Sequence, residues 1–128
     1  MSKKIVHTSS APAAVGPYSQ AVGAPAGQVV FLSGQIGLVP ATGVMISDRF
    51  EDQVRQSFAN MQAVIEAAGG RLENIVKLTL FLTDLTQFSV VNHVMAELIP
   101  EPFPARSTVG VSSLPKDAQF EVEAIIVI

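Results

Sequence analysis

Positively charged side chains are scarce in the second half of this chain, which makes one arginine a candidate for chemistry. After Lys77 the only Lys and Arg residues are Arg106 and Lys116. Arg106 stands among small and β-branched residues of a predicted strand, where a guanidinium group requires a carboxylate or phosphate partner. Glu121 and Glu123, on the next predicted strand, are available internal partners. The residues therefore allow two interpretations: a structural Arg–Glu ion pair, or an arginine that binds a ligand carboxylate while a glutamate handles water or a proton.

Catalytic chemistries of other kinds find little support in the sequence. His7 and His93 lie in unrelated contexts and belong to no metal-ligating cluster, so surface positions are predicted for both. The chain contains no Cys, which excludes disulfides, thiolate metal sites and a cysteine nucleophile. It also lacks the HExxH, Walker, GxGxxG and GxSxG motifs. Gly34-Gln35-Ile36-Gly37 matches the GxxG of KH domains, but without surrounding basic residues a turn that ends a strand is the favoured interpretation.

The composition is that of one small globular domain. The 128 residues are 48% hydrophobic and 15% charged, with a mean hydropathy of +0.41. This length predicts a single domain over residues 1–128. The net charge of −3 disfavours nucleic acid as a partner, and the sequence suggests neither a bilayer-spanning segment nor a signal peptide. We expect a cytoplasmic protein without membrane contact that oligomerises, because so small a domain cannot hide this much apolar surface alone.

Apolar periodicity predicts the elements that must position these residues. From Phe50 to Ala68 apolar residues recur every three or four positions, which predicts a helix with Asp48 and Glu51 as its cap and Gly69-Gly70 as its end. A shorter helix is predicted over Phe88–Leu98. The remaining predictions are strands at 29–32, 75–83, 106–111 and 120–127, a turn at 40–43, and extended chain that wraps a surface at 8–28.

The last strand predicts a sheet with one uncovered face. Residues 120–127 alternate between two faces, but the second half of this strand is apolar on both. Two helices cover only one side of a sheet, so the other side must meet another subunit or leave Ile125, Val127 and Phe81 in contact with water. The predicted architecture is an α+β sandwich whose bare sheet face binds a partner.

Five motifs, which follow one another in order over almost the whole chain, resemble the reactive intermediate deaminase family, also called the YjgF/RidA family. Each motif alone is weak evidence, but the five together are specific. They are Ala11 to Ala21 (APAAVGPYSQA), Ser33 to Ile36 (SGQI), Ile65 to Gly69 (IEAAG), Phe103 to Ser107 (FPARS), and Leu114 to Asp117 (LPKD) leading to Glu121 to Ala124 (EVEA).

The resemblance implies a fold and an activity. The implied fold is α+β and chorismate mutase-like, a mixed sheet with two helices packed on one face, assembled as a homotrimer around a central barrel. Ligand clefts are then expected between neighbouring subunits. The implied activity is hydrolysis of enamine and imine acids, such as 2-aminoacrylate and 2-iminobutanoate, to 2-keto acids and ammonia. The family uses no cofactor, so none is expected here, and the expected ligand is a small carboxylate-bearing imine, enamine or 2-keto acid.

Carried over residue by residue, the resemblance assigns roles to several side chains. The carboxylate-binding arginine of the family corresponds to Arg106, and its water-positioning glutamate to Glu121. The pocket tyrosine corresponds to Tyr18, and the glycine expected to line the cleft with its backbone to Gly34. The other residues expected at the substrate site are Ser33, Ser107, Thr108 and Asn92, the last without an assigned role.

Three departures from the family pattern leave the substrate and the activity open. Thr108 stands where the family commonly has a cysteine, the segment before Phe103 is shorter than usual, and the stretch around Gly23–Gly27 is longer. Both loop changes can alter substrate choice, which could extend to imines from aromatic or pyrimidine breakdown. The alternatives to catalysis are a trimeric protein that binds 2-keto acids without turnover, and an endoribonuclease or translation inhibitor, which the acidic balance disfavours.

Overall fold

The structure is a computed structural model that describes residues 3–128. Short 3-10 turns precede β6, α2 and β8, at Leu72–Asn74, Leu85–Gln87 and Pro115–Asp117. The helices and strands, in chain order, are β1 (Lys4–Val6), β2 (Ala21–Gly23), β3 (Val29–Gln35), β4 (Leu38–Val39), β5 (Val44–Met45), α1 (Phe50–Ala67), β6 (Ile75–Leu82), α2 (Phe88–Leu98), β7 (Ala105–Gly110) and β8 (Phe120–Val127).

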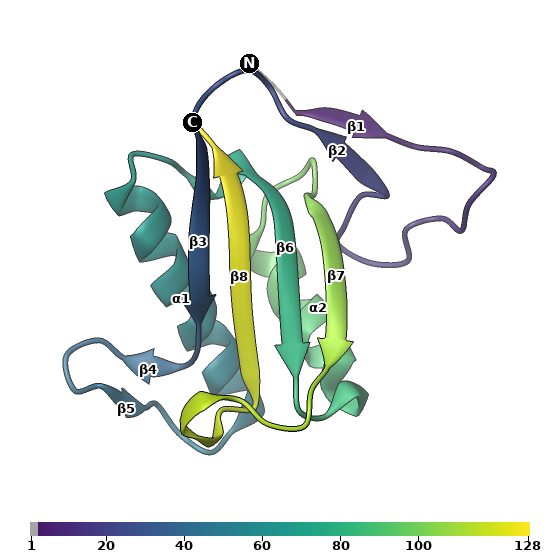
Figure 1. Ribbon diagram of the computed structural model, residues 1–128. Helices are drawn as coiled ribbons and strands as arrows, with labels where there is room; N and C mark the ends of the chain where they lie inside the picture. The colour runs from purple at the N-terminus through teal and green to yellow at the C-terminus, as the bar shows by residue number, and fades with distance from the viewer. Residues whose placement is uncertain (1–2) are drawn as a thin grey trace.

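A four-stranded mixed sheet forms the centre of the molecule, with the strand order β3-β8-β6-β7. Strand β8 runs antiparallel to β3 and β6, whereas β6 and β7 are parallel. Figure 1 shows both helices behind the same face of this sheet, while the β1-β2 and β4-β5 hairpins extend from opposite corners. The predicted α+β architecture with two helices on one face is confirmed.

Helix α1 forms where its apolar stripe predicts it and ends where its glycines predict. Gly69 adopts a φ of +90°, which favours glycine. Its N–H donates to the Glu66 carbonyl and the N–H of Gly70 donates to the Ile65 carbonyl, each at 3.0 Å, and these two hydrogen bonds form a Schellman motif.

Neither helix among residues 3–128 combines the length and apolarity needed to cross a bilayer. The buried apolar residues of α1 are Phe50, Val54, Phe58, Met61 and Ile65.

The start of α1 differs from the prediction. The N-cap residue is Arg49, whose side chain makes no capping hydrogen bond. The hydroxyl of Ser47 accepts the Arg49 N–H at 3.0 Å and donates to the Asp52 carboxylate at 2.8 Å. The predicted cap formed by Asp48 and Glu51 is therefore wrong, because a serine earlier in the chain organises this turn instead.

Side chains along the central strands point alternately to the two faces of the sheet, and those on the helix side form one core with the helices. The ring of Phe120 packs against Phe50 and Phe58, with centroid distances of 6.2 Å and 5.8 Å. From Leu78 onward, strand register directs the even-numbered residues of β6 toward the helices together with those of β8, because paired residues share a face of the sheet. The fully buried even-numbered residues of the two strands are Leu78, Leu80, Leu82, Phe120, Val122 and Ile126.

The other face of the sheet, which we call the open face, carries no helix in the part of the chain that the structure describes (Figure 1). The side chain of Phe31 is 75% exposed there, although Val127, expected in contact with water, is only 4% exposed. The predicted bare apolar face is otherwise confirmed, and such a patch is typical of an interaction surface. Its apolar residues are Val29, Phe31, Phe81, Val109 and Ile125.

Strand β3 extends further than predicted. The sequence predicts its end at Ser33-Gly34, but pairing with β8 continues to Gln35, which lies opposite Val122. A register shift between Leu32 and Gln35 accommodates the two intervening residues. The prediction of a terminal turn is wrong because these residues form a β-bulge inside the strand.

Residues 4–23 form a hairpin, which we call the arm, and the loop of this hairpin projects from the body of the protein. Figure 1 shows the loop between β1 and β2 extending away from the sheet edge, and residues 8–16 are exposed throughout. The Gln20 side chain holds this loop, since its amide nitrogen donates to the carbonyls of Thr8 at 3.1 Å and Pro12 at 2.7 Å. The predicted wrapping is wrong for residues 8–16, because this loop makes hydrogen bonds to the arm itself, whereas Ser19 is hydrogen-bonded to the body at Phe103 and Pro104.

Candidate active site

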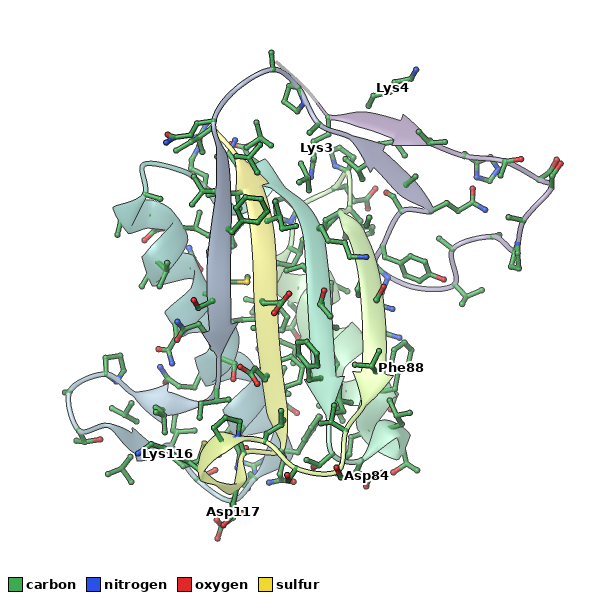
Figure 2. All side chains as sticks on the ribbon, viewed as in Figure 1. Lys3, Lys4, Asp84, Phe88, Lys116 and Asp117 are labelled. Atoms are coloured by element: carbon green, nitrogen blue, oxygen red, sulfur yellow. The ribbon has the colours of Figure 1, made fainter. Side chains whose placement is uncertain are left out.

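The guanidinium group of Arg106 lies between two aromatic rings. Its Cζ atom is 4.7 Å from the Tyr18 ring centroid and 5.1 Å from the Phe88 ring centroid. Nη1 donates to Asn92 Oδ1 at 2.7 Å and contacts Met95 Sδ at 3.5 Å. Figure 2 shows Phe88 beside β7, the strand that carries Arg106. We call Tyr18, Phe88, Asn92, Met95 and Arg106 the arginine cluster.

Tyr18 reaches the arginine cluster because the end of the arm is attached to the start of β7. The N–H of Ser19 donates to the Pro104 carbonyl at 2.9 Å, and its hydroxyl donates to the Phe103 carbonyl. The Tyr18 hydroxyl in turn accepts the N–H of Val15 at 3.3 Å. Hydrogen bonds to backbone groups therefore fix the ring beside a strand that is distant in sequence.

The charge of Arg106 is not neutralised within the described chain. Among residues 3–128, Arg106 forms no ion pair with a carboxylate. Partial burial lowers the pKa of its guanidinium group, against a smaller opposing effect of Tyr18, but arginine stays protonated in proteins. Asn92, its hydrogen-bond acceptor, is neutral. The guanidinium group therefore keeps a charge and donors that a ligand carboxylate can satisfy.

The sheet separates Arg106 from the two glutamates of β8. Register pairs Arg106 with Leu78, a buried residue on the helix side, and pairs Glu121 with Phe81 on the open face. Glu123, two residues along β8, lies on the open face as well. The structural Arg–Glu ion pair, one of the two interpretations of the sequence, is therefore wrong, because the partners project from opposite faces.

The carboxyl group of Glu121 lies against β3 at Gly34. A Cβ atom built on Gly34 would stand 2.7 Å from Glu121 Cδ. Partial burial raises the pKa of the Glu121 carboxyl, and the nearby charge of Glu123 raises it further. A raised carboxyl pKa suits a group that takes a proton from water near neutral pH. Ser33, beside Gly34, is exposed.

The two residues after Arg106 point in opposite directions. Thr108 pairs with Leu80 and so shares the helix-side face with Arg106. Its Oγ1 atom is buried without a hydrogen-bond partner among the described residues. Ser107 faces the other way, where its hydroxyl accepts a hydrogen bond from Lys77 Nζ at 3.1 Å. The structure therefore groups Thr108 with Arg106 and separates Ser107 from it.

The histidines take no part in the arginine cluster. Both His7 and His93 are exposed, as predicted. His93 contacts Glu97 at 2.9 Å on the outer surface of α2. Within residues 3–128, no three His, Asp or Glu side chains gather in a way that could hold a metal ion.

The sequence does not predict that two members of the arginine cluster, Phe88 and Met95, belong to the site. Phe88 and Met95 fit the apolar stripe of the second predicted helix and look like ordinary core residues. Contact with Arg106 distinguishes them, and that contact depends on the packing of α2 beside β7. Asn92, which the sequence leaves without a role, is the hydrogen-bond acceptor of Arg106. The one local feature that could have indicated this role is the polar side chain of Asn92 next to the apolar residues of the helix.

A hollow of about 380 Å³ lies apart from both groups of residues. Lys3 and Arg71 supply its positive charges. Lys3 Nζ already donates to the carbonyls of Ile75 at 3.0 Å and Pro102 at 2.9 Å, and Arg71 pairs with Glu73 at 2.9 Å. The hollow contains none of the residues that the sequence assigns to the substrate site.

Known proteins share both the sequence and the fold. Residues 8–128 match the family model described as Endoribonuclease L-PSP. The 2-iminobutanoate/2-iminopropanoate deaminase of Dermatophagoides farinae is 47% identical over 126 residues, which cover 98% of this chain and 97% of that protein. RidA from the Antarctic bacterium Psychrobacter sp. superposes with a TM-score of 0.77 at 44% identity, over 98% of this chain and 99% of that one. Escherichia coli TdcF with bound serine superposes with a TM-score of 0.72 at 42% identity, over 98% of each chain.

The matched region spans nearly the whole chain and includes both the arginine cluster and Glu121. The resemblance found in the sequence motifs is confirmed by this match and by the shared fold. The chain belongs to the Endoribonuclease L-PSP family, which includes the reactive intermediate deaminases.

Proposed function

We propose that this protein is an enamine and imine deaminase that hydrolyses small 2-imino acids to 2-keto acids and ammonia. The observation that carries the proposal is the charged guanidinium group of Arg106, held between Tyr18 and Phe88 without a carboxylate partner in residues 3–128. The names of two relatives support it, since one is a deaminase of 2-iminobutanoate and 2-iminopropanoate and the other holds bound serine. Each of these molecules carries a carboxylate next to the carbon that bears nitrogen, and arginine binds carboxylates well.

The chemistry demands little of the protein, because a protonated imine is already electrophilic. Water adds to C2 and loses a proton to give a carbinolamine; its C–N bond then breaks, and nitrogen leaves as ammonia while the hydroxyl proton is lost. An enamine enters the same route after its C3 atom takes up a proton. In this proposal Arg106 orients the carboxylate, Glu121 accepts the proton of water and returns one to nitrogen, and Tyr18 lines the site. No cofactor takes part.

We also propose that a homotrimer completes the site. Arg106 and Glu121 project from opposite faces of one sheet, so one chain does not offer both to a single small ligand. The exposed apolar residues of the open face supply a surface for association. In a chorismate mutase-like trimer, three sheets enclose a central barrel, and Glu121 of one subunit approaches Arg106 of its neighbour. The proposed location is the cytoplasm.

Replacing Arg106 with lysine should weaken binding of 2-ketobutyrate and leave the fold intact. Lysine keeps the charge but loses the forked donors and the stacking between two rings. A lost charged hydrogen bond of about 1.5–3 kcal/mol corresponds to a Kd raised roughly 10- to 100-fold, measured by calorimetry. The matched control is Arg71→Lys, since the Arg71 side chain is 82% exposed. An unchanged Kd in Arg106→Lys would contradict the assignment.

Replacing Glu121 with glutamine should remove turnover and preserve ligand binding. The amide has the shape of the carboxylate but accepts no proton at neutral pH, so kcat should fall roughly 10²- to 10⁴-fold. The assay couples the purified protein to a threonine dehydratase and follows 2-ketobutyrate against the uncatalysed rate. Unchanged turnover would move the role to Glu123 or to bulk water. A native protein that binds 2-ketobutyrate without rate enhancement would instead be a binding protein.

Replacing Glu123 with glutamine should shift the acid limb of the pH–rate profile to lower pH. The limb reports protonation of Glu121, whose pKa is raised first by burial and second by Glu123. Removing the second charge lowers the pKa of Glu121, so the active carboxylate persists to lower pH. Glu66→Gln removes the same charge from the distant, exposed surface of α1 and should leave the limb in place. If the acid limb of Glu123→Gln shifts to higher pH or does not shift, Glu121 is not the titrating base.

Replacing Phe31 with a charged residue should both dissociate the proposed oligomer and abolish hydrolysis. Phe31 is 75% exposed on the open face and belongs to neither the arginine cluster nor the Glu121 site. Phe31→Asp places a carboxylate in the surface that the proposed trimer buries. Light scattering measures the mass, and the coupled assay measures turnover. Val44→Asp, on the β4-β5 hairpin and 62% exposed, is the control. A Phe31→Asp variant that keeps its mass and activity would exclude this face as the interface.

A further inference from the structure

We propose that Gly34 is a positioning residue for Glu121: the absence of a side chain at this position leaves the space in which the carboxyl group lies against β3. The inference rests on the proposed function and adds a geometric requirement to it. A Cβ atom on Gly34 would overlap Glu121 Oε2 and stand 2.7 Å from its Cδ and 3.1 Å from its Cγ. Any side chain at position 34 therefore competes with the carboxyl group for the same volume.

The β-bulge in β3 brings Gly34 and Glu121 to the same face. Leu32 pairs with Ala124 and Gln35 with Val122, so three steps along β3 correspond to two along β8. Ser33 and Gly34 together occupy the place opposite one β8 residue, and the alternation of side chains changes phase across the bulge. Bulges next to functional sites commonly redirect a side chain. In this sheet the bulge directs position 34 toward the carboxyl group of Glu121.

The surroundings of the Glu121 side chain act on its ionisation as well as on its position. On the open face it has Phe81 opposite on β6 and Glu123 two residues along β8. Partial burial and the like charge of Glu123 both disfavour the ionised carboxylate. A Cβ atom at position 34 would remove the space beside β3 that the carboxyl group occupies, and so would change these surroundings.

The atoms that would clash belong to the far end of a flexible side chain, which determines how a substitution acts. An alanine at position 34 forces the Glu121 carboxyl to rotate and does not press on the backbone of β8. The fold should survive, but the group that handles the proton of water moves. A displacement of about 1 Å at a reacting group can lower a rate by roughly 100-fold.

The test compares Gly34→Ala with the native protein in the coupled assay and in calorimetry. We expect kcat to fall roughly 10- to 100-fold, and calorimetry with 2-ketobutyrate separates this loss of turnover from any change in ligand affinity. In a Glu121→Gln background, Gly34→Ala should cause no further loss of kcat, since the residue acts through the carboxylate. Gly43→Asn, in a turn with open space around the residue, is the control and should keep native turnover.

The kinetic results and the titration of Glu121 each decide the inference. A native kcat in Gly34→Ala, or a loss that adds in full to that of Glu121→Gln, overturns it, because the glycine would then act independently of the carboxyl group. If the native protein itself lacks hydrolytic activity, the proposed function fails, and an NMR titration of the labelled Glu121 carboxyl still tests the positioning. A Glu121 pKa that differs between native protein and Gly34→Ala supports the contact, and an identical one refutes it.

Discussion

The structure depends on a guanidinium group that is stacked and hydrogen-bonded but not neutralised. The rings of Tyr18 and Phe88 both contact the Arg106 guanidinium group, and Asn92 accepts one of its hydrogen bonds, yet residues 3–128 offer it no carboxylate. A partly buried charge without a counter-ion is unfavourable, and rings and an amide compensate only part of that loss. Three distant segments, the arm, α2 and β7, are nevertheless arranged to hold it. This arrangement is better explained by an anion that binds from outside than by a structural role.

The alternation of side chains along a strand separates the two chemical tasks. Arg106 projects to the helix side of the sheet with Leu78, whereas Glu121 projects to the open face with Phe81. Within one chain the sheet backbone stands between the proposed anion-binding group, Arg106, and the proposed proton-accepting group, Glu121. A small substrate spans only a few bonds, so both groups can act on it only if they come from different copies. The bare apolar face and the divided site therefore point to the same association.

Periodicity in the sequence is sufficient to predict the elements, and long-range packing accounts for what it misses. The helices at 50–67 and 88–98 and the strand at 120–127 follow from their apolar repeats, as does the open face on which Phe31 is exposed. The end of β3 at Gly34 and the Arg106–Glu ion pair are wrong because both depend on strand register. The cap by Asp48 is wrong because the neighbouring Ser47 organises the turn instead. Phe88 is indistinguishable from a core residue until α2 is packed beside β7. The family motifs identify Arg106, Tyr18 and Glu121 as candidates without showing that the sheet divides them.

Assembly of the proposed trimer would act on the ionisation of Glu121 in two opposite ways. Glu121 is only partly buried in one chain, and this burial already raises the pKa of its carboxyl group. A neighbouring subunit that covers the open face would remove more water from the same group and raise the pKa further, whereas the guanidinium group of the neighbour's Arg106 would lower it. The contact with Gly34 and the charge of Glu123 act on the same carboxyl group within one chain. In the proposed enzyme the base therefore meets its complete electrostatic environment only in the oligomer, where a guanidinium group faces it across the cleft.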